Sequence, residues 1–147
     1  MAKFQYRMQN ILEIKEKLET QAKTDFATAS HKLRTEEEKL EEIYNYIDKY
    51  KESIRQINSS RLDLLQLKAC NNAIKIKRFD AKNQKTNIKL AQKDLDIARV
   101  KLNKVMAERK THEILKEKAF DEFKKEQENN EHKEVDELIS FQYSKLD

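Results

Sequence analysis

The segment His112-Glu113-Ile114-Leu115-Lys116 comes close to a known zinc-binding motif. In HExxH, two histidines four residues apart lie on one face of a helix and bind zinc, while the glutamate acts as a general base. In this chain Lys116 takes the place of the second histidine. A cationic ammonium group does not coordinate zinc, which needs a neutral imidazole. We therefore expect no metal site and no metalloprotease activity here.

The other residue types that could do chemistry stand alone. His31 and His132 lie in strongly charged stretches, and we expect their side chains to be solvated. Cys70 is the single cysteine and has no obvious histidine partner, which is typical of a small apolar filler in a reducing compartment. Without glycine the chain also has no phosphate-binding loop. The sequence therefore predicts no cofactor and no enzymatic activity.

The composition indicates which elements hold these residues. The 147 residues include no glycine and no proline, which most sheets, barrels and tight turns need. Charged residues make up 39% and hydrophobic residues 37%, too few apolar side chains for the layered core of a compact domain. We expect an all-α fold in which long helices bury one narrow seam.

Apolar residues recur with the seven-residue spacing of a coiled coil. From residue 26 the a and d positions are Phe26, Ala29, Leu33, Glu36, Leu40, Ile43, Ile47, Tyr50, Ile54, Ile57, Arg61 and Leu64. Upstream the seam is predicted at Phe4, Met8, Ile11, Lys15, Leu18 and Ala22. The four-residue step from Ala22 to Phe26 predicts a local unwinding. A second seam comprises Ile88, Ala91, Leu95, Ala98, Leu102 and Val105, then Arg109, His112 and Lys116, then Ala119, Phe120 and Phe123.

Between the seams the chain must reverse, and three polar stretches compete for the turn: 58–60, 71–72 and 83–87. The first is favoured because Ser60 can cap the next helix while Asp63, three residues on, completes a weak capping box. The stretch 71–72 stays open, because asparagine also occurs at a positions of continuous coiled coils.

We therefore expect a single coiled-coil unit over residues 1–147. Helix one is predicted at 4–57, the turn at 58–61 and helix two at 62–145. The predicted fold is a long two-helix antiparallel coiled-coil hairpin with unequal arms.

The unequal arms leave part of helix two unpaired. A reversal near residue 59 places residue 4 opposite about residue 114, so that residues 116–147 form an overhang. This overhang carries a last apolar cluster: Val135, Leu138, Ile139 and Leu146. Because a solitary amphipathic helix gains little stability from its own propensity, we expect the overhang to bind a partner.

Charge is concentrated in the middle of the chain, where residues 61–105 carry 12 basic and 4 acidic side chains. Either these side chains form a solvated helix face, or they dock an acidic protein surface or anionic lipid. Nucleic acid is disfavoured, because no basic stretch alternates with stacking aromatics. Near the predicted turn, Tyr44 and Tyr46 lie off the a and d positions and suggest a contact patch, which Tyr50, Ile76 and Phe79 could join.

The two ends of the chain resemble the flagellar export protein FliJ family. Residues Phe4-Gln5-Tyr6-Arg7-Met8-Gln9-Asn10-Ile11-Leu12-Glu13-Ile14-Lys15-Glu16 are similar to its opening pattern, aromatic-x-aromatic-Arg-Leu/Met-Gln-x-aliphatic-Leu followed by Lys-Glu. Residues Glu131-His132-Lys133-Glu134-Val135-Asp136-Glu137-Leu138 resemble its closing acidic-x-Lys-x-x-Asp-Glu-aliphatic stretch. The middle departs from the pattern, since this chain lacks the glycine that relatives often carry at the turn.

The resemblance implies a cytoplasmic, non-enzymatic component of the flagellar type III protein export apparatus, at the cytoplasmic face of the membrane at the flagellar base. It also implies a fold similar to the central stalk of rotary ATPases. The implied partners are the export ATPase FliI, whose ring assembly it promotes, the cytoplasmic domain of the export gate FlhA, and export chaperones. The link to the inner membrane would run through the gate, and no nucleic acid or cofactor is implied.

Together, the resemblance and the overhang assign these partners to opposite ends of the hairpin. The candidate ATPase contacts are Arg7, Gln9, Lys133, Val135, Asp136, Glu137, Leu138 and Ile139. The candidate export-gate contacts are Tyr44, Tyr46, Tyr50, Ile76 and Phe79.

Two other classes stay open. A homodimeric coiled-coil scaffold or spacer would use the same heptads between chains. A helix lying on a membrane surface is suggested by four apolar residues near Lys3 and Arg7, namely Phe4, Met8, Ile11 and Leu12. The stretch that follows is charged on every side, which argues against it.

Overall fold

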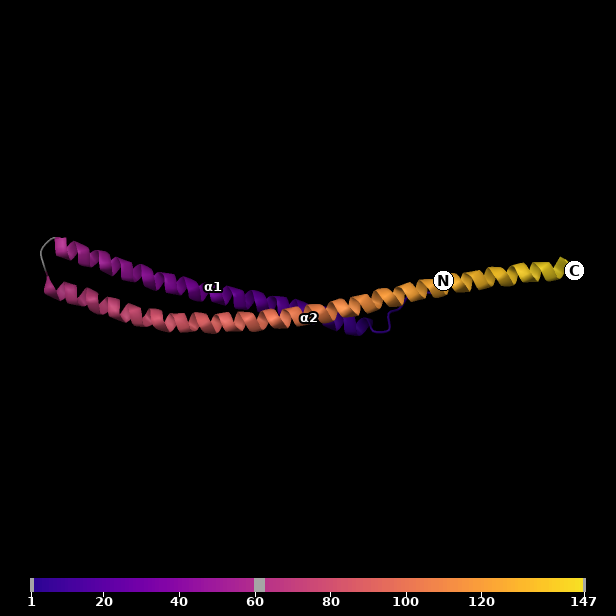
Figure 1. Ribbon diagram of the computed structural model, residues 1–147, viewed down its shortest axis with the longest axis horizontal. Coiled ribbons are helices and arrows are strands. Elements are labelled where there is room, and N and C mark those ends of the chain that lie inside the picture. Colours follow the sequence, from indigo (N-terminus) through magenta and orange to yellow (C-terminus); the bar gives the residue numbers. More distant parts are fainter. Residues whose placement is uncertain (1, 60–62, 147) are drawn as a thin grey trace. The chain divides into compact units, whose positions relative to one another are not determined.

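Two long α-helices make up the fold in the computed structural model (Figure 1). Helix α1 spans Gln9–Ser59 and helix α2 spans Leu64–Leu146, which are 51 and 83 residues long. The structure describes residues 2–59 and 63–146. Within each of two compact units, a stretch of α1 packs against a stretch of α2 that runs in the opposite direction. The predicted all-α hairpin with unequal arms is therefore confirmed.

Helix α1 begins later than the sequence pattern predicts. Residue 4 was expected to open it, whereas the first helical residue is Gln9, whose backbone N–H donates to the Tyr6 carbonyl oxygen at 3.1 Å. The Phe4 ring instead packs against Phe120 and Phe123 of α2, with ring centroids 5.1 and 5.5 Å away. Because aromatic packing of this kind adds stability beyond the buried area, it outweighs the helix propensity of the first residues.

The helices are joined in the region where the turn was predicted. The expected cap, Ser60, and its neighbour Arg61 lie outside the described residues. Asp63, expected inside the first helical turn, immediately precedes α2, and its Oδ1 accepts hydrogen bonds from the backbone N–H groups of Leu65 and Gln66 at 3.0 and 3.4 Å. This is the geometry of an N-cap. The competing stretches 71–72 and 83–87 both lie within α2 and are not turns.

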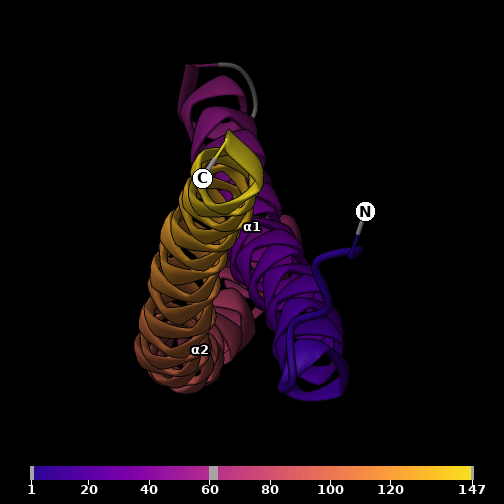
Figure 2. The same cartoon turned by 90° about the vertical axis from the view of Figure 1, so that its right-hand side faces the viewer.

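The chain divides into two compact units, each formed by a stretch of α1 beside a stretch of α2. Unit 1 comprises Met1–Thr20 and Asn103–Asp147, and unit 2 comprises Gln21–Leu102. In unit 2 the helices lie side by side in both views (Figures 1 and 2). Its buried apolar side chains recur at heptad spacing and comprise Ala22, Ile47, Ile74, Ala81, Ala91 and Leu95.

The unit 2 seam follows the predicted positions and extends them. Ala22, Ile47, Ala91 and Leu95 were all predicted at a or d positions. The same spacing continues backward along α2 through Ile74 and Ala81, which the sequence pattern had not included.

The seam of unit 1 differs from the prediction in phase. Leu12 is 2% exposed, whereas Ile11 and Leu18, which were predicted to face α2, are 37% and 45% exposed. Glu19 is buried instead. The side of α1 that turns to α2 therefore keeps an uninterrupted heptad spacing through Leu12, Lys15, Glu19, Ala22 and Phe26. The predicted unwinding at Ala22 is wrong: the step from Ala22 to Phe26 is an ordinary heptad step, because Glu19 rather than Leu18 is the seam residue before Ala22.

Unit 1 also corrects the predicted pairing of the arms. Phe4 contacts Phe120 and Phe123 rather than the neighbourhood of residue 114. Gln127 is the last partly buried residue of α2, and residues 128–146 are all exposed. The overhang therefore begins near residue 128 and not at 116. The physical reason is the position of the reversal, because α1 continues through residue 59 and α2 starts only at residue 64. When the centre of a hairpin moves by one residue, the residue of α2 that lies opposite a given residue of α1 changes by two.

Candidate functional site

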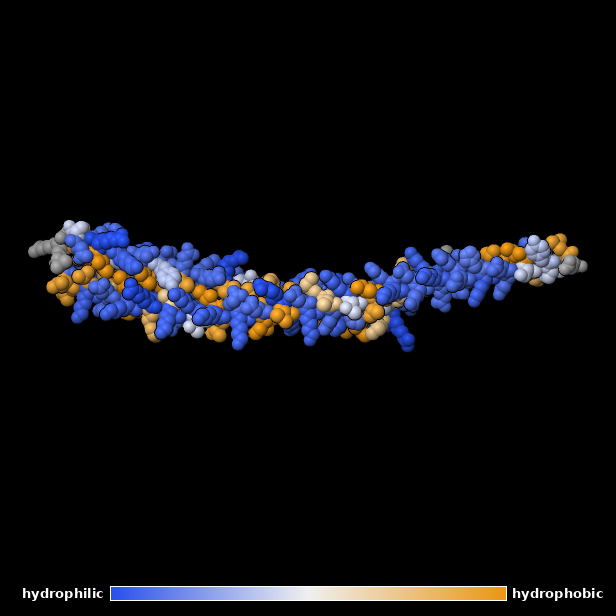
Figure 3. All heavy atoms as spheres, in the orientation of Figure 1, coloured by the Kyte–Doolittle hydropathy of each residue, from blue (hydrophilic) through white to orange (hydrophobic). Residues whose placement is uncertain are grey.

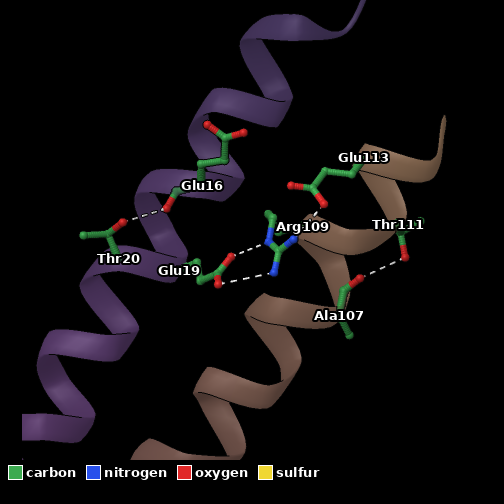
Figure 4. A network of polar contacts seen from close by, with 7 residues as sticks. All are labelled: Glu16, Glu19, Thr20, Ala107, Arg109, Thr111 and Glu113. Carbon is green, nitrogen blue, oxygen red and sulfur yellow. Dashed lines mark hydrogen bonds and ion pairs between the residues drawn. The ribbon is translucent and has the colours of Figure 1, made fainter. Parts of the chain in front are cut away.

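An ionic cluster joins α1 to α2 inside unit 1 (Figure 4). Arg109 donates from Nε and Nη2 to the two carboxylate oxygens of Glu19, and from Nη1 to Glu113 at 2.7 Å. The side chains of Arg109 and Glu19 are only 18% and 9% exposed. The hydrogen bond to Glu19 raises the pKa of Arg109, which keeps the guanidinium charged. This forked pairing fixes the angle as well as the distance between the two helices.

A second ion pair lies beside this cluster. Lys15 Nζ donates to Glu108 Oε2 at 2.9 Å across the same seam. The hydrogen bond from Lys15 lowers the pKa of Glu108 below its ordinary value of 4.5. Unit 1 therefore has two consecutive seam layers in which opposite charges, one from each helix, take the place of apolar side chains.

The zinc-like segment serves packing in this arrangement. Glu113 accepts the hydrogen bond from Arg109, while His112 and Lys116 are partly buried seam positions, as the second predicted seam placed them. Within residues 2–59 and 63–146, no three His, Cys, Asp or Glu side chains are grouped so that they could hold a metal ion. The geometry thus assigns this segment to helix pairing.

The end of α2 presents apolar side chains that α1 does not reach. Five side chains, exposed between 46% and 83%, share one side of the helix: Val135, Leu138, Ile139, Tyr143 and Leu146. Figure 3 shows orange apolar atoms at this end of the chain, next to a stretch of blue polar atoms. Residues 124–146 carry six acidic and four basic side chains, so the segment that bears the apolar face has a net negative charge. A helix surface of this kind is typical of a partner-binding segment.

The predicted ATPase-contact residues do not form one continuous patch. Arg7 and Gln9 lie at the start of the chain, next to the Phe4 ring that packs on Phe123. Lys133 lies ten residues beyond Phe123, about 15 Å farther along α2 at the rise of an α-helix. The exposed tail face thus stands apart from the residues at the start of α1. The tail contributes two aromatic residues that the sequence analysis passed over, Phe141 and Tyr143, both exposed.

In unit 2, two of the predicted tyrosines meet lysines of α2. Lys77 Nζ lies 4.6 Å from the centre of the Tyr46 ring, and Lys85 Nζ lies 5.9 Å from that of Tyr44. Both rings stay 40% to 47% exposed. Tyr50 is partly buried, as a d position requires. The two outer tyrosines therefore form an aromatic and cationic strip across both helices.

Ile76 and Phe79 lie on a different side of α2 from this strip. They are 62% and 63% exposed, whereas Ile74 and Lys77 turn toward α1. The predicted grouping of Ile76 and Phe79 with the tyrosines is therefore not what the helix geometry provides.

A polar layer lies in the same unit. Gln84 Nε2 donates to the backbone carbonyl oxygen of Glu36 at 2.8 Å and to its Oε2, and Asn87 donates to Gln84 at 3.2 Å. The hydrogen bond from Gln84 lowers the pKa of Glu36. The sequence pattern correctly placed Glu36 in the seam but gave no sign of its partner.

Comparison with known proteins gives one match. A family model described as "Flagellar FliJ protein" matches residues 4–146. The searches of curated proteins and of solved structures each returned no match. Among the described residues, neither helix contains an apolar stretch long enough to cross a membrane.

Proposed function

Because the chain belongs to the flagellar FliJ protein family, we propose that it links the export ATPase to the export gate through a separate contact on each unit. As a family member it is a non-catalytic component of the flagellar export apparatus. The ATPase contact lies on the unpaired tail of α2 and the gate contact on the tyrosine strip of unit 2. In this role it promotes ATPase ring assembly and escorts export chaperones in the cytoplasm at the flagellar base.

The observation that carries the ATPase contact is the exposed apolar face of residues 128–146. Five apolar side chains on one helix face, with no α1 residue beside them, leave apolar surface in water. Burying each against a partner is worth about 1.5–3 kcal/mol for a side chain of this size. A partner that covers this face therefore gains a large part of its affinity from these residues.

Stiffness within each unit supports this role. A packed seam resists bending and holds the contact residues of its unit in place, which a flexible linker cannot do. The layers Glu19–Arg109, Lys15–Glu108 and Glu36–Gln84 add directional pairs that keep α1 from sliding along α2 within each unit.

The ATPase contact can be tested by adding charge to the apolar face of the tail. We expect Leu138→Asp with Ile139→Asp to abolish stimulation of the cognate export ATPase, and deletion of residues 130–147 to do the same. Ser140→Asp with Ser144→Asp is the matched control, because both serines lie away from the apolar face and receive the same two charges. Circular dichroism of each variant checks that α1 and the remainder of α2 stay helical. Unchanged stimulation by the double variant would exclude the tail as the contact.

The gate contact needs a separate pair of variants. We expect Tyr44→Ala with Tyr46→Ala to weaken binding to the isolated cytoplasmic domain of the export gate while ATPase stimulation stays intact. Both tyrosines are exposed, so their removal leaves the seam of unit 2 in place. If the tail variants and the tyrosine variants impair the same partner equally, the division between two contacts is wrong.

A further inference from the structure

Helix α2 carries a second row of apolar side chains on the side that faces away from α1. The row consists of Ile76, Phe79, Leu90, Ile97 and Val100. These side chains are 58% to 69% exposed, although five large apolar residues in 25 positions is a density expected of a buried face. Figure 3 shows apolar side chains along the outer edge of α2. All five lie within unit 2.

The outer row has the spacing of a coiled-coil seam. Steps of three and four residues give the positions 76, 79, 83, 86, 90, 93, 97 and 100, in two alternating sets. Ile76, Asn83, Leu90 and Ile97 occupy the first set, which corresponds to a positions. Phe79, Thr86, Lys93 and Val100 occupy the second set, which corresponds to d positions. A single asparagine among the a positions is the device that specifies two parallel strands in one register.

Complementary charges border the outer row, including Asp96 before its last a position and Lys101 after its last d position. Lys75 and Lys89 each precede an a position of the row, and Asp80 and Asp94 each follow a d position. A lysine and the aspartate five residues later are the pair that meets across a parallel two-stranded coiled coil. In the part of the chain that the structure describes, none of these four side chains takes part in an ion pair.

We propose that the outer row of α2 binds the outer row of a second copy of this chain, parallel and in register, while each copy keeps its own hairpin. In this arrangement Lys75 of each copy faces Asp80 of the other, and Lys89 faces Asp94. The five apolar side chains of each copy lose their contact with water. This inference rests on the described face of unit 2 and is independent of the proposed function.

The charges decide the orientation. In an antiparallel pair each border meets the same border of the other copy, and the border of Lys75, Lys82, Lys89 and Asp96 then brings lysine against lysine over part of its length. In the parallel arrangement Lys75, Lys89 and Asp96 meet Asp80, Asp94 and Lys101 of the other copy and no like charges meet, so this arrangement is favoured. The dimer is reversible, because Asn83, Thr86 and Lys93 interrupt its apolar contact.

Sedimentation equilibrium of the full chain over a range of concentrations measures this association. We expect the mass to rise from that of one chain to that of two. Leu90→Lys removes an apolar side chain from both copies and should weaken the association on the order of 100-fold. Leu18→Lys is the control, because Leu18 is a similarly exposed leucine on α1 and should leave the association unchanged. A chain that stays monomeric at every concentration overturns the proposal.

Charge reversal tests which residues meet. Asp80→Lys with Asp94→Lys places lysine opposite lysine at both pairs, and Lys75→Asp with Lys89→Asp places aspartate opposite aspartate. We expect neither variant to dimerise alone and their equimolar mixture to form a mixed dimer. If each variant alone dimerises with the same affinity as the parent chain, the proposed pairing of these lysines and aspartates is wrong. If a variant unfolds, circular dichroism shows it, and restored association in the mixture still supports the proposal.

The parallel orientation of the two copies can be tested by disulfide cross-linking. In a Cys70→Ser background, Ile97→Cys places a thiol at an a position, where two parallel chains in register bring the same residue together. We expect oxidation to give a disulfide-linked dimer with Ile97→Cys and not with Glu52→Cys, an exposed position on α1. Equal cross-linking at both positions, or at neither, overturns the parallel arrangement. If the outer row instead serves a different protein, the isolated chain stays monomeric and gives no cross-link.

Discussion

The phase of the unit 1 seam can be tested by comparing two leucines of α1. Leu12 is 2% exposed and Leu18 is 45% exposed, although a seam read from apolar residues alone selects Leu18. Truncating a buried leucine to alanine costs roughly 2–5 kcal/mol, which includes the cavity left behind. A seam between only two helices can partly collapse around a cavity, so we expect about 3 kcal/mol for Leu12→Ala.

Leu18→Ala is the matched perturbation. Its side chain already keeps almost half of its surface in water, and its removal leaves no enclosed cavity. We therefore expect a cost of about 1 kcal/mol or less. Both changes place alanine in the same helix, so the difference between them reports on burial rather than on helix propensity.

Hydrogen exchange is the suitable assay, because unit 1 and unit 2 can open separately. The protection of backbone amides in residues 9–20 and 103–119 gives the local free energy of opening. Leu12→Ala should lower it by roughly three times as much as Leu18→Ala. Equal losses, or a larger loss for Leu18→Ala, would show that Leu18 faces α2 and that Glu19 does not lie in the seam.

Three further outcomes follow from the polar contacts. Arg109→Leu leaves the buried Glu19 carboxylate without its partner and should lower the melting temperature, whereas adding Glu19→Leu should recover it, as differential scanning calorimetry can measure. Glu108 has its pKa lowered by Lys15, so its contribution to stability is present above pH 4.5 and is lost as the pH falls through the lowered pKa; Glu108→Gln should flatten the melting temperature over that acidic range. Asp63→Ala removes the N-cap of α2 and should cost about 1 kcal/mol in urea unfolding.

The fold class could be predicted from the sequence because the composition and the heptad spacing of the apolar residues determine it. A chain without glycine or proline has few ways to leave a helix, and the heptads from Phe26 onward settle which side is buried. Ile47, Ala91 and Leu95 are buried as predicted. The resemblance of the two ends to the FliJ family is confirmed by the match over residues 4–146.

The prediction of the seam failed where a polar side chain occupies a buried seam position. Glu19 is buried only because Arg109 comes from a segment 90 residues away, and no local pattern reveals such a partner. The helix start failed for a similar reason, since Phe4 leaves the helix to reach Phe120. The sequence analysis expected Ser60 as the N-cap of α2, whereas Asp63 accepts the capping hydrogen bonds. Serine and aspartate are both good N-caps, and propensity alone does not choose between them. The contacts with partners stay predictions.

The two rows of α2 suggest why the seam toward α1 contains charged layers at all. A helix that is apolar on two sides could pair with α1 through either side, and apolar contacts alone distinguish the two weakly. Gln84, buried in the inner seam, finds its partner in Glu36 only when that side faces α1. Turning the outer row toward α1 would leave Gln84 and Glu36 without each other and would bring Lys93 into the seam. The polar layers thus select the inner row for the hairpin and leave the outer row of α2 for a second chain.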